Sequence, residues 1–99
     1  MARFDVYRSR VSNGFLLDCQ ADILAVLNTR LVVPLLPEGT IPQFDRRLNP
    51  VMEIADERYV MVTQAAVAVP TAQLGDRAGS LASENFTITA ALDMLLTGY

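Results

Sequence analysis

The first twenty residues alternate between apolar and polar positions. In residues 3–7, Phe4 and Val6 fall on one side and polar or charged residues on the other, which is the period of a half-buried strand. Residues 15–20 repeat the alternation, and residues 9–14 between them end in Ser-Asn-Gly, a turn signal. The pattern predicts a β-hairpin with a polar tip.

The next segment changes character twice. Residues 21–28 carry apolar side chains without a clear period, and Asp22 could begin a short helical turn. Residues 29–36 are rich in β-branched side chains and predict a strand. Because proline cannot donate to a sheet ladder, Pro34 predicts either that this strand lies at a sheet edge or that Pro34 is among its final residues. Residues 38–43, which contain Gly39 and Pro42, predict a loop.

A second hairpin is predicted in the middle of the chain. Residues 49–54 and 58–63 alternate, and the polar residues 55–57 separate them. Residues 64–72 predict a short helical turn or bend followed by an edge strand, and Gly75 and Gly79 bracket a further loop.

The last segment predicts one amphipathic helix over about residues 84–97. Ser83 is a natural N-cap, Glu84 suits the first turn, and Gly98 stands where a helix would unwind. The apolar residues recur at helical spacing and form one stripe: Ile88, Ala91, Leu92, Leu95, Leu96 and Tyr99. The order of elements predicts a mainly β fold with one C-terminal α-helix, in a single domain over residues 1–99.

Composition adds an expectation about partners. Apolar residues make up 52% of the chain, more than one small monomer needs, which indicates a homodimer contact or another partner site. A net charge of −3 and a pI near 4.7 argue against direct nucleic-acid binding. No apolar run approaches the roughly 20 residues of a membrane span, and a single cysteine, Cys19, fits a reducing cytoplasm.

The chain is poorly equipped for catalysis. It has no histidine, and one cysteine cannot assemble a zinc site, so we expect no metal, no cofactor and no enzymatic activity. Asp18 and Asp22 are interpreted as solvated carboxylates rather than an acid–base pair. Charged residues near two turns, namely Arg8, Arg10, Asp45, Arg46 and Arg47, are interpreted as solvated rims that could bind an acidic partner segment by bidentate pairing.

Several runs of the sequence resemble one known family. Phe4-Asp-Val-Tyr, Leu17-Asp-Cys-Gln-Ala-Asp-Ile-Leu and Arg30-Leu-Val-Val-Pro-Leu occur in the order seen in CcdB toxins, and Asn49-Pro-Val and the C-terminal residues continue the match. The resemblance implies a homodimer with an SH3-like barrel or antiparallel sheet of the CcdB/MazF type. It also implies a toxin that binds the A subunit of DNA gyrase, traps the cleaved DNA complex and is neutralised by a CcdA-like antitoxin.

The resemblance further implies which residues take part. Gyrase contact is expected at Ile23, Leu24, Asp93, Leu96, Thr97, Gly98 and Tyr99. From their charge near the two turns, and not from the resemblance, Arg8, Arg10, Asp45 and Arg46 are expected to contact the antitoxin. The family's defining Trp-Gly-Ile ending reads Thr97-Gly98-Tyr99 here, so only the glycine is retained. Two alternatives therefore stay open: a degenerate homologue that only binds antitoxin, and an endoribonuclease like the MazF toxins, which share this fold.

Overall fold

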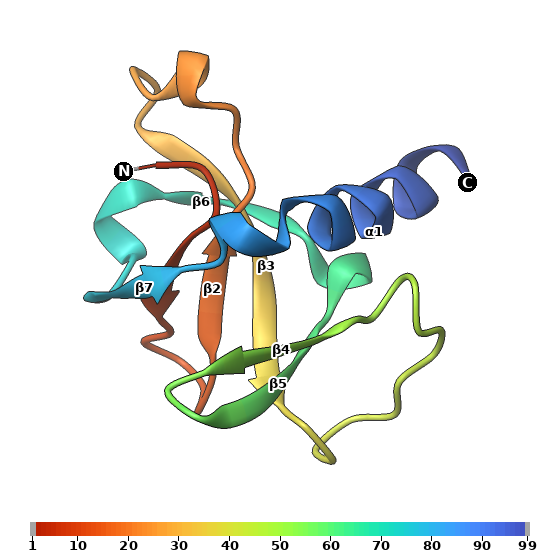
Figure 1. The fold of residues 1–99 in the computed structure, drawn as a ribbon. Coiled ribbons are helices and arrows are strands. Elements are labelled where there is room, and N and C mark those ends of the chain that lie inside the picture. The colour runs from red at the N-terminus through yellow and green to blue at the C-terminus, as the bar shows by residue number, and fades with distance from the viewer. Residues whose placement is uncertain (1, 99) are drawn as a thin grey trace.

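Both predicted hairpins form, and they belong to one curved antiparallel sheet (Figure 1). The computed structural model describes residues 2–98. The six strands of the main path run in the order β4-β5-β3-β2-β1-β7, and a seventh strand, β6, pairs with β3. The strands are β1 Asp5–Arg8, β2 Phe15–Asp18, β3 Thr29–Pro37, β4 Val51–Ile54, β5 Glu57–Met61, β6 Val67–Pro70 and β7 Arg77–Ser80.

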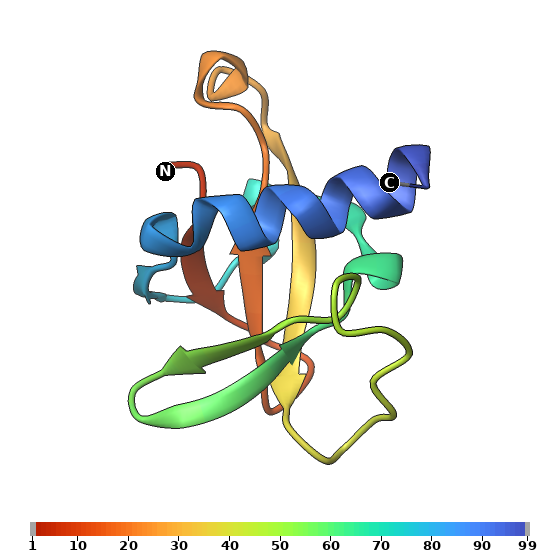
Figure 2. The same cartoon turned by 45° about the vertical axis from the view of Figure 1, so that its right-hand side comes forward.

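The alternation of apolar residues builds the core on one face of this sheet. Val6 on β1 lies opposite Leu17 on β2, and Leu17 lies opposite Val33 on β3. All three are essentially buried and belong to one cluster that also includes residues of β4, β5 and α1, the helix Asn85–Thr97. Figure 2 shows α1 crossing the sheet, and Ile88 and Ala91 are the helix residues that it buries completely.

The second hairpin turns through two residues with left-handed backbone. Ala55 and Asp56 have φ values of 52° and 66°, which is the geometry of the two-residue turns that match strand twist. The predicted helical turn and edge strand after this hairpin are also confirmed. The 3-10 turn η2 spans Thr63–Ala65, and β6 then pairs with β3 alone among the described strands.

The prediction that Pro34 puts its strand at a sheet edge is wrong. β3 lies inside the sheet, with β2 on one side and both β6 and β5 on the other. Pro34 falls where the second side changes partner, because β6 ends opposite Val32 and β5 begins opposite Leu35. The Pro34 carbonyl accepts the Val62 N–H at 2.9 Å. Because the nitrogen and the carbonyl of one residue point to the same side of a strand, the Pro34 nitrogen also faces the gap between β6 and β5, where no N–H donor is needed.

The prediction of a loop between Gly75 and Gly79 is also wrong in part. Arg77–Ser80 forms β7, which pairs with β1 across a bulge between Val6 and Tyr7. This strand has no apolar alternation of its own. Backbone pairing supplies its structure, and it begins where the Arg8 N–H donates to the Asp76 carbonyl at 2.9 Å.

The helix forms close to its predicted range, with one error at its start. Ser83 is not the N-cap, because it lies inside the 3-10 turn η4 (Ala82–Glu84) that leads into the helix. Gly98 ends the helix as predicted, with φ 82° and an N–H that donates to the Met94 carbonyl. None of the helices in residues 2–98 is long and apolar enough to span a membrane.

Candidate functional site

A loop between β2 and β3 presents apolar side chains to solvent. It covers residues 21–28, contains the 3-10 turn η1 (Asp22–Leu24), and projects from the sheet at the top of Figure 1. Ile23 is 87% exposed and Val26 92% exposed, and Leu24 and Leu27 are each about half exposed. Exposed apolar clusters of this kind mark binding surfaces more often than isolated apolar residues do. We call residues 21–28 the apolar loop.

The C-terminal end of α1 is a second exposed apolar region. The predicted stripe divides here, because its first members are buried whereas Leu95 is 39% and Leu96 78% exposed. Thr97 is exposed, but its hydroxyl donates to the Asp93 carbonyl at 2.6 Å. The helix end therefore offers an apolar residue, Leu96, next to a threonine that is occupied within its own helix. The predicted contact at Tyr99 lies outside the described residues.

The predicted gyrase-binding residues form two groups rather than one. Figures 1 and 2 both place the apolar loop apart from the C-terminal end of α1. The first residues of β3 lie between them, where Leu31 is 39% exposed on the face that carries Val33 and the core. One chain thus displays Ile23 and Leu24 on one projection and Asp93, Leu96, Thr97 and Gly98 on another.

Of the predicted antitoxin-binding arginines of the first hairpin, Arg10 lines an apolar pocket, whereas Arg8 lies on the other face of the sheet, against Phe15 of the core. Arg10 donates to the Leu74 carbonyl from two guanidinium nitrogens, at 3.2 and 3.1 Å. The Arg8 guanidinium stands 5.6 Å from the centre of the Phe15 ring. The pocket, of about 590 Å³, lies on the sheet face opposite the helix and is lined by Ser9, Arg10, Val11, Leu16, Pro34, Val67, Val69, Ala72 and Gln73.

Asp45 and Arg46 lie on a different element, the long loop before β4. The Asp45 carboxylate accepts the N–H groups of Arg47 and Leu48 at 2.8 and 3.1 Å, so it organises the turn. Arg46 is exposed on that turn. Within residues 2–98 no hydrogen bond or ion pair joins the two predicted antitoxin-binding groups.

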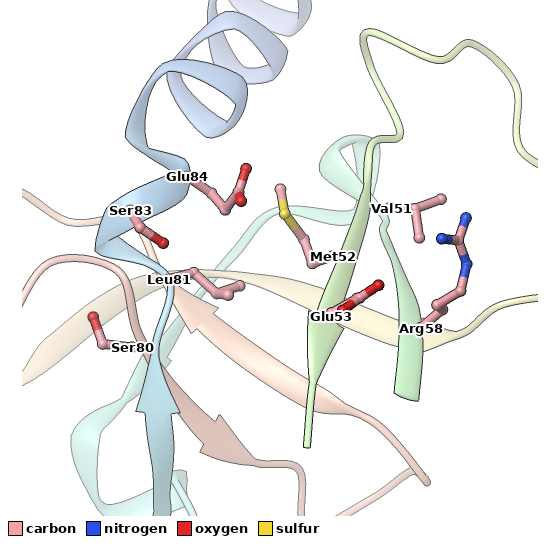
Figure 3. Close-up of a pocket in the computed structure, with 8 residues that line it drawn as sticks. All are labelled: Val51, Met52, Glu53, Arg58, Ser80, Leu81, Ser83 and Glu84. Carbon is pink, nitrogen blue, oxygen red and sulfur yellow. The ribbon is translucent and has the colours of Figure 1, made fainter. Parts of the chain in front are cut away.

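A polar pocket of about 380 Å³ lies between β4 and the start of α1, as Figure 3 shows. Its arginine, Arg58, is held by Glu38 through two hydrogen bonds of 2.8 and 3.1 Å. None of the predicted site residues lines this pocket. No group of three potential metal-ligating side chains occurs in the part of the chain that the structure describes.

Comparison with known families identifies the chain. The model of the CcdB family, described as CcdB protein, matches residues 3–98. The chain belongs to the CcdB family. This membership confirms the resemblance and implies partners of the toxin–antitoxin kind.

Solved structures agree on the fold of this CcdB-family chain. An endoribonuclease from a mycobacterial species superposes with a TM-score of 0.75 and is 22% identical, over 97% of this chain and 90% of the other. The Mycobacterium tuberculosis toxin MazF-mt6 superposes with a TM-score of 0.73 at 16% identity, over 92% of this chain and 93% of the other. These similarities show a shared fold, which confirms the predicted architecture.

One sequence-based interpretation of the CcdB-family site residues is wrong. Asp18 is not solvated: it is fully buried and pairs with Arg30, which is 1% exposed. The pair was missed because the carboxylate and the guanidinium meet only when β2 and β3 come together. Cys19 is buried as interpreted, and burial raises the pKa of its thiol to about 12.

Proposed function

We propose that this protein is the toxin of a type II toxin–antitoxin system. It binds the A subunit of DNA gyrase and traps the cleaved DNA complex, and it acts by binding rather than by catalysis in the cytoplasm. One observation carries the proposal: the segments that the family resemblance implies for gyrase contact include Ile23 and Leu96, two of the most exposed apolar side chains of residues 2–98.

Burial of these side chains could supply a useful share of a binding free energy. Complete burial of an exposed isoleucine or leucine contributes about 2 kcal/mol. Ile23 and Leu96, at 87% and 78% exposed, would together contribute about 3.3 kcal/mol, or roughly 250-fold in affinity. A weaker contribution is expected from Leu24, which is 45% exposed.

The helix end supports this proposal less strongly than the loop does. Thr97 cannot provide the large aromatic contact area that tryptophan brings to a binding hot spot. Its hydroxyl is also held by the Asp93 carbonyl. We therefore place most of the gyrase contact on Ile23, Leu24 and Leu96, and a smaller share on Asp93, Thr97, Gly98 and Tyr99.

The test combines binding and toxicity. Ile23→Ser should weaken binding to a purified fragment of the gyrase A dimerisation region by about 30-fold, because it removes one buried apolar anchor. Val11→Ser is the matched control, since Val11 is 96% exposed on the distant first hairpin. Expression in bacteria with an altered gyrase A dimerisation gate should abolish toxicity. Toxicity that persists unchanged in that strain would count against the proposal.

The second part of the proposal is a homodimer. Half-exposed apolar residues form a surface contributed by the apolar loop, the start of β3 and the helix end, namely Leu27, Leu31 and Leu95. A two-fold contact there would cover this surface and could bring the loop of one copy near the helix end of the other. Leu31→Glu should shift the protein to monomer in sedimentation equilibrium, and an unchanged dimer would exclude this surface.

The third part of the proposal is a CcdA-like antitoxin that binds across the first hairpin. Arg10 lines the 590 Å³ apolar pocket, Arg8 lies on the opposite face of the same hairpin, and Arg46 offers a further cation on the long loop. An acidic, disordered segment with apolar side chains would complement this combination of charge and apolar surface. Arg10→Glu should weaken binding of the antitoxin encoded beside the gene while gyrase binding persists.

A second candidate function is that of a homologue that only binds antitoxin, and it follows from the presence of Thr97 in place of an aromatic residue. A chain without the aromatic anchor could bind antitoxin and yet fail to poison gyrase. Thr97→Trp would then create toxicity that the natural chain lacks. Cleavage of single-stranded RNA by the purified protein would instead identify an endoribonuclease and contradict both candidates.

A further inference from the structure

The apolar loop is closed at its base by one side chain, that of Gln20. The carboxamide nitrogen of Gln20 donates to the carbonyls of Leu24 and Thr29, at 3.1 Å each. Its oxygen accepts the N–H of Leu31 at 3.0 Å. These three bonds join the strand that enters the loop, the turn at its tip and the strand that leaves it.

A buried ion pair fixes the position of Gln20. One carboxylate oxygen of Asp18 accepts the Gln20 N–H at 3.0 Å, and the other accepts the Arg30 Nε–H at 2.8 Å. Asp18 and Arg30 are 0% and 1% exposed, so neither can turn toward water without opening the sheet. The loop is thus tied, through Gln20, to a rigid point in β2 and β3.

Few other contacts hold the loop. Asp22 accepts the Arg3 N–H at 2.7 Å and the Asn28 carbonyl accepts the Thr71 N–H at 2.9 Å, and the remaining bonds lie within the loop itself, such as the Leu27 N–H to the Leu24 carbonyl at 3.0 Å. All residues from 21 to 28 are exposed, so packing contributes little to the loop's conformation. Hydrogen bonds at its base must therefore select that conformation.

We propose that Gln20 is a positioning residue for the apolar loop. Its carboxamide holds residues 21–28 in one conformation, so that Ile23 and Leu24 are presented ready to bind. The inference rests on the proposed function for the identity of the partner, which is the A subunit of gyrase. The closure of the loop by Gln20 is independent of the proposed function, because it can be measured without a partner.

The consequence for binding follows from population arithmetic. A surface that is competent for binding only a fraction of the time has its affinity reduced by that fraction. If removal of the carboxamide leaves the loop closed about a tenth of the time, the Kd rises about tenfold with no contact residue changed. The fold itself should be little affected, because the bonds lost lie at the exposed end of the sheet.

The experiment compares three variants with the natural chain. Gln20→Ala removes all three side-chain bonds, and Gln20→Glu keeps an oxygen for the Leu31 N–H but has no donor for the two carbonyls. Gln43→Ala is the matched control, because Gln43 is an exposed glutamine whose carboxamide also donates to a backbone carbonyl, that of Asn49 at 2.6 Å, on the long loop before β4. Each is examined by amide hydrogen exchange in NMR and by titration with the gyrase A fragment, well below the melting temperature.

We expect Gln20→Ala to exchange its Leu31 and Leu27 amides at least about tenfold faster and to raise the Kd about tenfold. Gln20→Glu should keep most of the Leu31 protection and still weaken binding. Gln43→Ala should match the natural chain in both measurements.

The outcomes separate the two proposals. If the natural chain fails to bind the gyrase fragment but Gln20→Ala accelerates exchange in the loop, the gyrase proposal fails and the positioning role stands. If the natural chain binds and Gln20→Ala neither accelerates loop exchange nor weakens binding, the positioning role of Gln20 is overturned. Faster amide exchange in the loop with unchanged affinity for the gyrase fragment also overturns the positioning role, because closure of the loop would then not affect how Ile23 and Leu24 bind.

Discussion

Removal of the Arg30 guanidinium should destabilise the fold more than the loss of an exposed ion pair would, because the Asp18–Arg30 pair is buried. Arg30 Nε and one outer nitrogen lie 2.8 and 2.5 Å from the same Asp18 oxygen, and both side chains are almost fully buried. Arg30→Met keeps most of the side-chain volume. It leaves the Asp18 carboxylate in the interior with only the Gln20 N–H as a hydrogen-bond donor from the fold.

The magnitude follows from the cost of an unpaired buried charge. Breaking a buried pair from one side typically costs about 3–5 kcal/mol. Gln20 offsets part of this cost, so we expect about 3 kcal/mol for Arg30→Met. For a domain of 99 residues this corresponds to a melting temperature lower by roughly 12–24 °C. Exposed ion pairs, in contrast, contribute at most about 1 kcal/mol.

The assay is urea unfolding followed by far-UV circular dichroism at one fixed protomer concentration. Fixed concentration matters because a dimer would make apparent stability depend on it. The double variant Asp18→Leu/Arg30→Met replaces the pair with apolar side chains and should cost no more than about 1–2 kcal/mol. The coupling free energy between the two sites would then be at least about 2 kcal/mol.

Two results would refute this reasoning. A loss below about 1 kcal/mol for Arg30→Met would mean that the carboxylate reaches water or another partner. A double variant that costs the sum of the two single variants would mean that the charges do not interact across the β2–β3 pair.

Three further outcomes are expected. Cys19 should resist a thiol reagent at pH 8 until the protein unfolds, because burial raises its pKa to about 12, and rapid labelling of the native protein would contradict this. Gly14→Ala should cost about 3 kcal/mol in urea unfolding, because a Cβ there would overlap the Leu35 carbonyl oxygen. Burial tends to raise the pKa of Asp5, but the hydrogen bonds from Arg77 and the Ala2 N–H and the charge of Arg77 together outweigh it and hold that pKa below the ordinary 3.8. The resulting stability, under about 1 kcal/mol because Arg77 is half exposed, is present above pH 3.8 and lost as the pH falls below it. Arg77→Met should remove that acid dependence.

The helix and the two hairpins could be predicted because residues close together in the sequence determine them. The helix start and end were predicted within one or two residues, because the apolar spacing and Gly98 act within a few residues of the chain. The two hairpins were predicted for the same reason, from alternation on either side of polar turns.

The errors concern residues whose surroundings are built by distant segments. β7 has a polar, glycine-containing sequence and becomes a strand only because β1 lies beside it. Pro34 is tolerated inside the sheet because two different strands meet opposite it. The interpretation of Asp18 as solvated fails because nothing near it in sequence indicates Arg30. Which strands pair with each other is difficult to predict from a single sequence, because the partners are distant along the chain.

The structure gives a physical meaning to the two sequence runs that carried the family resemblance. Asp18 and Gln20 in the first run and Arg30 in the second do not form an exposed surface. They are the buried pair and the carboxamide that hold the apolar loop. If Gln20 positions the loop as proposed, these three residues act together to place Ile23 and Leu24 for binding. If gyrase is the partner, binding should depend more on Ile23 than on Thr97. Thr97→Ala should leave the affinity nearly unchanged where Ile23→Ser lowers it about 30-fold.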